Sequence, residues 1–201
     1  MKAGKNKAAF LDRDGTINVE VGYLSKPDDL ELIPGAARAV ARLNDAGYIV
    51  VVVTNQAGVA RGYFTEEDVR LVNQRMIEVL GPWGARIDGI YYCPHHPDFG
   101  DETYRKDCDC RKPNTGMVTQ AAQEFDIDLS RSYVVGDHMG DVLLGINAGA
   151  RSIHVLTGHG DSEREKLIEN SISPVYLASD LTEAVEYILS QDTEESKHGY
   201  R

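Results

Sequence analysis

Cysteine is scarce in this sequence, with three residues among 201. The three are Cys93, Cys108 and Cys110, an odd number gathered in one stretch, so a framework of paired disulfides is excluded. Cysteines gathered in this way favour metal binding or redox chemistry instead.

Long apolar runs and basic clusters are also missing. No segment approaches the roughly 20 apolar residues of a membrane span, and no secretory apolar stretch follows the basic residues 1–7. The chain has 21 basic and 32 acidic residues, a formal net charge of -11, and no cluster of Lys and Arg that would match a phosphate backbone. These absences predict a cytoplasmic protein that binds neither membranes nor nucleic acid.

Internal repeats and low-complexity segments are absent as well. A chain of 201 residues is long enough for one full core, whereas two domains would both be small. We therefore expect a single domain over residues 1–190. Residues 191–201 are polar, and we expect them to form a frayed tail.

Short apolar runs alternate with helical patterns along the chain. This alternation predicts an α/β fold with a doubly wound parallel sheet. Helices are predicted over 36–46, over 66–80 after an N-cap at Thr65, from an N-cap at Asn114 to residue 125, and from Asp180 onward. The predicted strands are residues 8–12, 49–54, 88–92, 132–136 and 152–156, with a weaker one at 175–177.

The first predicted strand ends in two acidic residues, Asp12 and Asp14, and Gly15 follows them. Open α/β sheets bind ligands at the carboxyl ends of their strands. Two carboxylates in different surroundings can divide into a nucleophile or metal ligand and a proton carrier. The alternative is an Asp-Gly turn with two solvated acids, which is a common turn composition.

Further polar residues lie at three other places, at strand ends or before a helix. Thr54 ends the second strand, Asp137 ends the fourth with Asp141 four residues later, and Lys112 precedes Pro113. A hydroxyl, a cation and carboxylates at one sheet edge suit the binding of a metal ion and a phosphoryl group. Each also has an ordinary explanation as a hydrogen-bonded strand end, a turn or a solvated charge.

Together, Asp12-Arg13-Asp14-Gly15-Thr16, Thr54, Lys112 and Gly136-Asp137 with Asp141 resemble the four motifs of the haloacid dehalogenase superfamily in order and spacing. The resemblance implies a Rossmann-like phosphatase domain. It implies that Mg²⁺ is held by the carboxylates of Asp12 and Asp137 and the carbonyl of Asp14. It also implies that Asp12 is the nucleophile, that Asp14 is the acid and base, and that Thr54 and Lys112 stabilise the phosphoryl group. Asp141 would be an outer residue that orients a metal-bound water or Lys112.

The cysteines have the spacing of a zinc site. Twelve residues separate His95, the second residue of the pair Cys93 and His95, from Cys108, the first of the pair Cys108 and Cys110. Three thiolates with one imidazole form a closed structural site. Zinc would then staple the loop 93–110 directly before Lys112. His96 is an alternative ligand, and unrelated reduced cysteines or a redox pair are alternative interpretations.

The zinc loop narrows the resemblance to two branches of the superfamily, heptose bisphosphate phosphatases and histidinol phosphatases. Residues 12–19, 54–62, 91–97 and 108–113 are similar to the first branch, which implies a Mg²⁺-dependent hydrolase acting on a small phosphorylated sugar in heptose precursor biosynthesis. Histidinol phosphatase is the alternative activity, and a phosphate-sensing scaffold is the non-enzymatic one. The branch often has lysine where this chain has His138. The resemblance implies substrate contacts at Glu20, Val21, Gly22, Tyr23, Asn55, Gln56, Ala57, Arg111 and His138.

The expected helices, strand and zinc loop fill the segments where a separate cap domain could be inserted. We therefore expect an open site without a cap, whose specificity is set by loops, in a protein that acts as a monomer.

Overall fold

A computed structural model describes residues 5–198, and side chains in its last helix are described up to residue 193. Its centre is a parallel sheet of six strands in the order β3-β2-β1-β4-β5-β6. The order reverses at β1, so β1 and β4 flank the point where open α/β sheets bind ligands. The strands are β1 (Ala8–Leu11), β2 (Ile49–Asn55), β3 (Gly89–Cys93), β4 (Tyr133–Gly136), β5 (Arg151–Val155) and β6 (Tyr176–Ala178).

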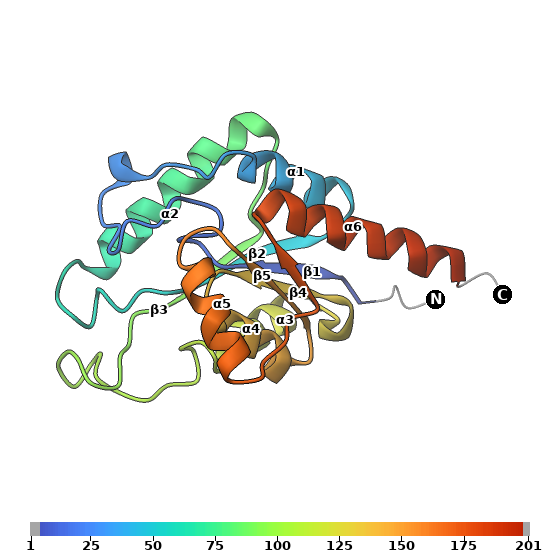
Figure 1. The fold of residues 1–201 in the computed structure, drawn as a ribbon. Helices are drawn as coiled ribbons and strands as arrows, with labels where there is room; N and C mark the ends of the chain where they lie inside the picture. The colour runs from blue at the N-terminus through green and yellow to red at the C-terminus, as the bar shows by residue number, and fades with distance from the viewer. Residues whose placement is uncertain (1–4, 199–201) are drawn as a thin grey trace.

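Helices cover both faces of this sheet (Figure 1). One face carries α1, α2 and α6, and the other carries α3, α4 and α5. No helix within residues 5–198 combines the length and the apolar character needed to cross a membrane. The helices are α1 (Ala36–Asp45), α2 (Glu66–Leu80), α3 (Gly116–Glu124), α4 (Met139–Ala148), α5 (Gly160–Glu169) and α6 (Leu181–His198).

Alternate residues of the central strand supply two separate hydrophobic cores. Ala9 and Leu11 pack into the core beneath α1 and α6, whereas Ala8 and Phe10 pack into the core above α3 and α4. All four are fully buried. A strand buried on both faces has no room for polar residues, which is why the sequence shows an uninterrupted apolar run here.

Loops at the carboxyl edge of the sheet supply the polar residues. The segments 12–35, 56–65 and 94–115 follow β1, β2 and β3 there, and shorter loops follow β4 and β5. Within residues 5–198 all six strands belong to one sheet, and no separate cap domain is inserted between them. The predicted doubly wound parallel sheet is confirmed.

Two local expectations are wrong. Asn114 does not cap α3, because its side-chain amide donates to the Cys108 carbonyl at 2.8 Å and the helix begins two residues later with no side-chain cap. Residues 191–198 continue α6 instead of forming a frayed tail, while residues 199–201 lie outside the described part of the chain.

Asp192 explains why α6 extends so far. Its carboxylate pairs with Lys7 Nζ at 2.6 Å and accepts a hydrogen bond from the Tyr48 hydroxyl at 3.0 Å. The polar composition of this segment signalled solvent exposure, but these partners are 144 and 185 residues away in the sequence. Helical ends are stabilised mainly by such tertiary contacts.

We predict that Asp192→Ala lowers the free energy of unfolding by about 1 kcal/mol, because it removes one partly exposed ion pair and one hydrogen bond. Urea unfolding followed by circular dichroism measures this change. Thr193→Ala is the control, and its exposed side chain should leave stability nearly unchanged. Equal stability of Asp192→Ala and the wild type would show that the contact does not hold the helix.

Candidate active site and metal centre

Lys112 lies between two carboxylates at the carboxyl edge of the sheet. Its Nζ is 2.9 Å from Asp12 Oδ1 and 2.6 Å from Asp141 Oδ1. All three residues are buried. Burial alone would lower the pKa of the lysine, yet the charges of Asp12 and Asp141 hold it above its ordinary value. Lys112 is therefore a fixed cation beside Asp12.

Asp137 completes a group of three buried carboxylates. Oxygens of Asp12, Asp137 and Asp141 lie within 4.8 Å of one another, in the arrangement that a metal ion can occupy. Asp137 Oδ2 accepts a hydrogen bond from the backbone of His159 at 2.8 Å, while its buried Oδ1 has no hydrogen-bond partner. Octahedral Mg²⁺ requires oxygen ligands of this kind.

Two glycines make room for the Asp137 carboxylate. A Cβ at Gly15 or at Gly158 would lie 2.2 Å from Asp137 Oδ2, and both glycines have a positive φ. Any larger residue would clash with the carboxylate and strain the backbone. Gly15, placed after Asp14, therefore serves the approach of Asp137 as well as the turn.

The group carries more negative charge than Lys112 can balance. Burial, helped by the nearby charge of Asp12, raises the pKa of Asp137 to about 8. Burial also raises the pKa of Asp12 to about 6, although Lys112 opposes this shift. Buried carboxylates with raised pKa values ionise fully at neutral pH only when another cation binds beside them. Mg²⁺ fits the oxygen donors present.

Asp14 has different surroundings from Asp12. Its carboxylate accepts hydrogen bonds from Arg13, from Asn18 at 2.9 Å and from Gln56 at 2.9 Å. Burial works against ionisation, but these donors and the Arg13 charge hold the pKa of Asp14 below its usual value. The two aspartates of the first motif are thus chemically distinct, as division of labour between them requires.

The end of β2 connects to this group through two amide side chains. Gln56 Nε2 donates to Thr54 Oγ1 at 3.0 Å as well as to Asp14. The Asn55 side chain accepts from the Lys112 backbone N–H at 3.0 Å and donates to its carbonyl at 3.3 Å. Asn55 therefore fixes the backbone that carries Lys112, a role that sequence similarity did not suggest.

These residues surround an open cavity of about 360 Å³. Most of the residues expected to contact a substrate line it, together with Asp12, Asp14, Thr54 and Lys112. Val21 does not line the cavity, and its side chain is exposed. The expected contacts that do line the cavity are Glu20, Gly22, Tyr23, Asn55, Gln56, Ala57, Arg111 and His138.

His138 lies at the cavity wall and has two neighbours. Its Nδ1 is 3.5 Å from Glu163 Oε2, and its ring centroid is 4.9 Å from that of His159. The Glu163 carboxylate is itself fixed by the Met139 backbone N–H at 3.0 Å.

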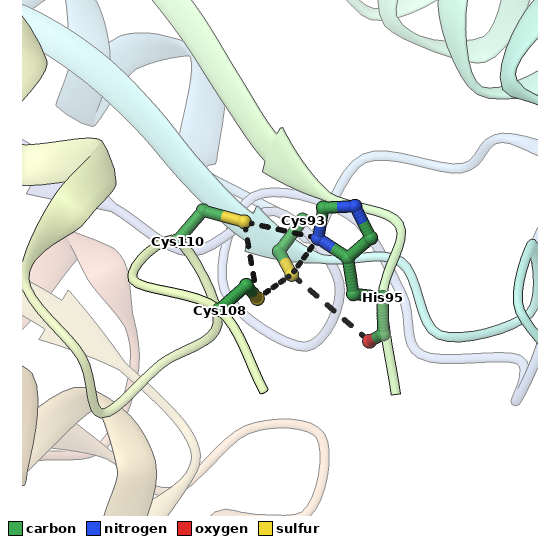
Figure 2. A group of neighbouring side chains, drawn as sticks. All are labelled: Cys93, His95, Cys108 and Cys110. Atoms are coloured by element: carbon green, nitrogen blue, oxygen red, sulfur yellow. Dashed lines mark hydrogen bonds between the residues drawn. The ribbon is translucent and has the colours of Figure 1, made fainter. Parts of the chain in front are cut away.

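The cysteine cluster forms at the base of the loop that follows β3 (Figure 2). His95 Nδ1 is 3.6 Å from Cys93 Sγ and 3.3 Å from Cys110 Sγ, and Cys108 Sγ is 3.5 Å and 3.3 Å from the other two sulfurs. The four ligand atoms converge on one point, so the cluster is compatible with a tetrahedral zinc ion. The cluster contains His95 and not His96, whose Nδ1 accepts instead from Asp98 N at 3.0 Å.

The cluster and the carboxylate group share one short segment. Cys110 belongs to the cluster, and Arg111 Nη1 donates to the His95 carbonyl at 3.2 Å. Lys112, the next residue, reaches Asp12. Only Arg111 therefore separates the candidate zinc ligand from the lysine that contacts the candidate nucleophile.

Comparison with known proteins agrees with this site. The model of the HAD-hydrolase-like family matches residues 109–184. A D-glycero-D-manno-heptose-1,7-bisphosphate 7-phosphatase of Thermosynechococcus vestitus is 46% identical over 90% of this chain and 94% of its own length. The corresponding β-heptose phosphatase of Haemophilus ducreyi is 45% identical over 83% of this chain and 94% of its own length.

A solved structure has the same architecture. The D,D-heptose 1,7-bisphosphate phosphatase of B. bronchiseptica, complexed with magnesium and phosphate, superposes with a TM-score of 0.80 at 34% identity, over 92% of this chain and 99% of that one. The fold and the site thus define a HAD-like hydrolase. Within that class, the chain belongs to the family of D-glycero-D-manno-heptose-1,7-bisphosphate 7-phosphatases. The histidinol phosphatase alternative has no support among these relatives.

Several site residues escaped the sequence reasoning. His159 and Gly158 contact Asp137 from the loop after β5, and Thr157 Oγ1 donates to the Gly15 carbonyl at 2.5 Å. Their place directly after a predicted strand was the available signal, since every other strand end near β1 carries a site residue. Arg13 gave no signal, because a lone arginine between two acids is ordinarily a solvated charge.

The shifted carboxylates predict an unusual pH dependence for the metal-free protein. Asp137 keeps its proton up to about pH 8 when folded but loses it near pH 4 when unfolded, so the free energy of unfolding should fall as pH rises between these values. Urea unfolding in the presence of a chelator measures the slope, which Asp137→Asn should reduce. Mg²⁺ should raise the melting temperature more at pH 8 than at pH 5. A slope unchanged in the variant would contradict the assignment.

Proposed function

We propose that this protein is a Mg²⁺-dependent phosphatase that removes the C7 phosphate from D-glycero-D-manno-heptose 1,7-bisphosphate and leaves the C1 phosphate in place. The observation that carries the proposal is the ion pair between Lys112 and Asp12 in the cavity described above. Lys112 Nζ lies 2.9 Å from Asp12 Oδ1. A lysine there can neutralise an incoming phosphoryl oxygen beside a carboxylate nucleophile. The names and identities of the relatives supply the substrate.

In the first step, a carboxylate oxygen of Asp12 attacks the phosphorus of the bound C7 phosphate. The bond from phosphorus to the sugar oxygen breaks, and Asp14, which takes up a proton when the anionic substrate binds beside it, gives that proton to the sugar oxygen. An alkoxide leaves poorly without a proton, so the second aspartate is essential for a sugar ester. The product of this step is an aspartyl phosphate on Asp12.

In the second step, the Asp14 carboxylate takes a proton from a water whose oxygen attacks the same phosphorus. The bond from phosphorus to Asp12 breaks, inorganic phosphate leaves and both aspartates return to their starting states. Lys112 and the Thr54 hydroxyl stabilise negative charge on the transferring group. The carboxylates of Asp12 and Asp137 and the carbonyl of Asp14 would hold Mg²⁺, which would supply further positive charge at the phosphoryl oxygens. Asp141 holds Lys112.

Arg111 is the candidate for recognition of the second phosphate. It lines the cavity next to Lys112, and its guanidinium is fixed by the His95 carbonyl. A planar guanidinium can hold two oxygens of one phosphate, which a histidinol phosphate does not offer at its imidazole end. Glu20, Tyr23 and Ala57 line the intervening cavity, where the sugar hydroxyls would lie.

Zinc has a structural role in this proposal. The four ligands all come from the protein, so the site is closed to substrate. Because Cys110 is two residues from Lys112, a bound zinc ion stabilises the segment that places Arg111 and Lys112 at the cavity. The metal would therefore contribute to activity through position and not through chemistry.

Phosphate release from a panel of phosphorylated compounds tests the proposed substrate. We expect kcat/KM to be highest with D-glycero-D-manno-heptose 1,7-bisphosphate and the product to retain its C1 phosphate.

Asp12→Asn should lose turnover while remaining folded, because the substitution removes the attacking charge with little change in volume. Arg111→Ala should reduce turnover of the bisphosphate far more than that of small monophosphates. An equal or higher kcat/KM with histidinol phosphate would overturn the assignment.

The zinc site predicts one zinc ion per chain, measured by elemental analysis of protein purified without chelators. Cys108→Ser and Cys110→Ser should lose the metal and lower both the melting temperature and the activity. His96→Ala, one residue from a ligand, is the matched control and should retain zinc. Freshly purified protein without zinc, or thiols that react rapidly before any chelator is added, would favour the redox alternative.

A further inference from the structure

Arg13 is a fully buried arginine inside the first motif. It contributes nothing to the lining of the cavity, and its side chain has no exposed surface. A buried guanidinium is strongly destabilising unless its N–H groups are paired. Arg13 has two side-chain partners, Asp14 and Asn73, and these show what the residue does.

The guanidinium holds both oxygens of Asp14. Nε donates to Oδ1 at 3.2 Å and Nη2 donates to Oδ2 at 2.8 Å. A two-pronged contact of this kind fixes the plane of a carboxylate as well as its position, which a single point charge does not. Nη1 donates to Asn73 Oδ1 at 2.9 Å, so the plane of Asp14 is tied to helix α2.

The remaining donors to Asp14 lie on different sides. Asn18 is fully buried, whereas Gln56 lines the cavity. A carboxylate has about four lone-pair positions, and Arg13, Asn18 and Gln56 together supply four donors. Of these donors only Gln56 lines the cavity, so a substrate oxygen that enters from the cavity would displace Gln56 and leave Arg13 and Asn18 in place.

We infer that Arg13, anchored by Asn73, is a positioning residue that holds the Asp14 carboxyl group in the orientation needed to transfer a proton to the leaving oxygen and later to take one from water. This inference rests on the proposed phosphatase function. Arg13 contacts no substrate in this scheme and exchanges no proton. Its contribution is orientation, since a proton must be delivered along the bond that is breaking.

The test compares two leaving groups in single-turnover mixing experiments. Heptose 1,7-bisphosphate releases an alkoxide that needs a proton, whereas p-nitrophenyl phosphate releases a stable phenolate that does not. We expect Arg13→Met to slow release of the heptose leaving group by about 100-fold or more, and release of p-nitrophenolate by less than about 10-fold, because these releases report the first step alone. Arg13→Lys should recover only part of the loss, because an ammonium lacks the fork.

Asn73→Leu tests the anchor without touching Arg13 and remains informative if Arg13→Met fails to fold. Asn73→Leu should slow the heptose substrate more than p-nitrophenyl phosphate, as Arg13→Met does, but by a smaller factor. Combined with Asp14→Asn it should add nothing, because both changes act through the same carboxyl group. Met76→Ala, on the same helix and buried in the main core, is the control for lost stability and should slow both substrates equally.

Equal slowing of both substrates in the Arg13 and Asn73 variants would overturn the inference and leave Arg13 a structural residue. So would additive effects with Asp14→Asn. Failure of the proposed function is distinguishable from either result, since it would appear in the wild-type protein as absence of turnover with the heptose substrate.

Discussion

The surplus of negative charge around Lys112 is the constraint on which the rest of this structure depends. Three buried carboxylates, Asp12, Asp137 and Asp141, face one ammonium group. Such a group is unfavourable in a protein interior unless further positive charge binds there. The same property that disfavours these carboxylates on their own gives the site affinity for a divalent cation and for the equatorial oxygens of a phosphoryl group that accompanies it.

The fold meets this constraint by dividing labour between the sheet and its loops. Alternate apolar residues of β1 and its neighbouring strands form two hydrophobic cores, one on each face of the sheet, and these fix the positions at which the carboxylates emerge. Lys112 comes instead from a long loop, which needs its own support. The Asn55 side chain is hydrogen-bonded to the backbone of Lys112. The candidate zinc ligands Cys108 and Cys110 lie just before Lys112 in the sequence. These attachments restrain the loop at the point where it carries Lys112.

The sequence predicts the strands well because strands buried on both faces must be apolar and end in turn residues. It locates Asp12, Thr54 and Asp137 for the same reason, since strand ends meet at one edge. It does not predict contacts that depend on distant partners. The Asp192 contact with Lys7 and the grip of Arg13 on Asp14 are examples, because nothing local distinguishes either residue from a solvated charge. Asn55 was expected to contact a substrate, whereas its side chain is hydrogen-bonded to the Lys112 backbone. The sequence does not separate these two roles, because an amide side chain can serve either.

The central claim of this account is that Asp12 carries the phosphoryl group between the two steps. Turnover of the heptose bisphosphate can be stopped with acid and the protein reduced with borohydride, which converts an aspartyl phosphate to homoserine. Peptide mass spectrometry then locates the modified residue. The account predicts homoserine at position 12 in the wild type and none in Asp12→Asn. Modification at another aspartate, or at no residue during active turnover, would contradict it.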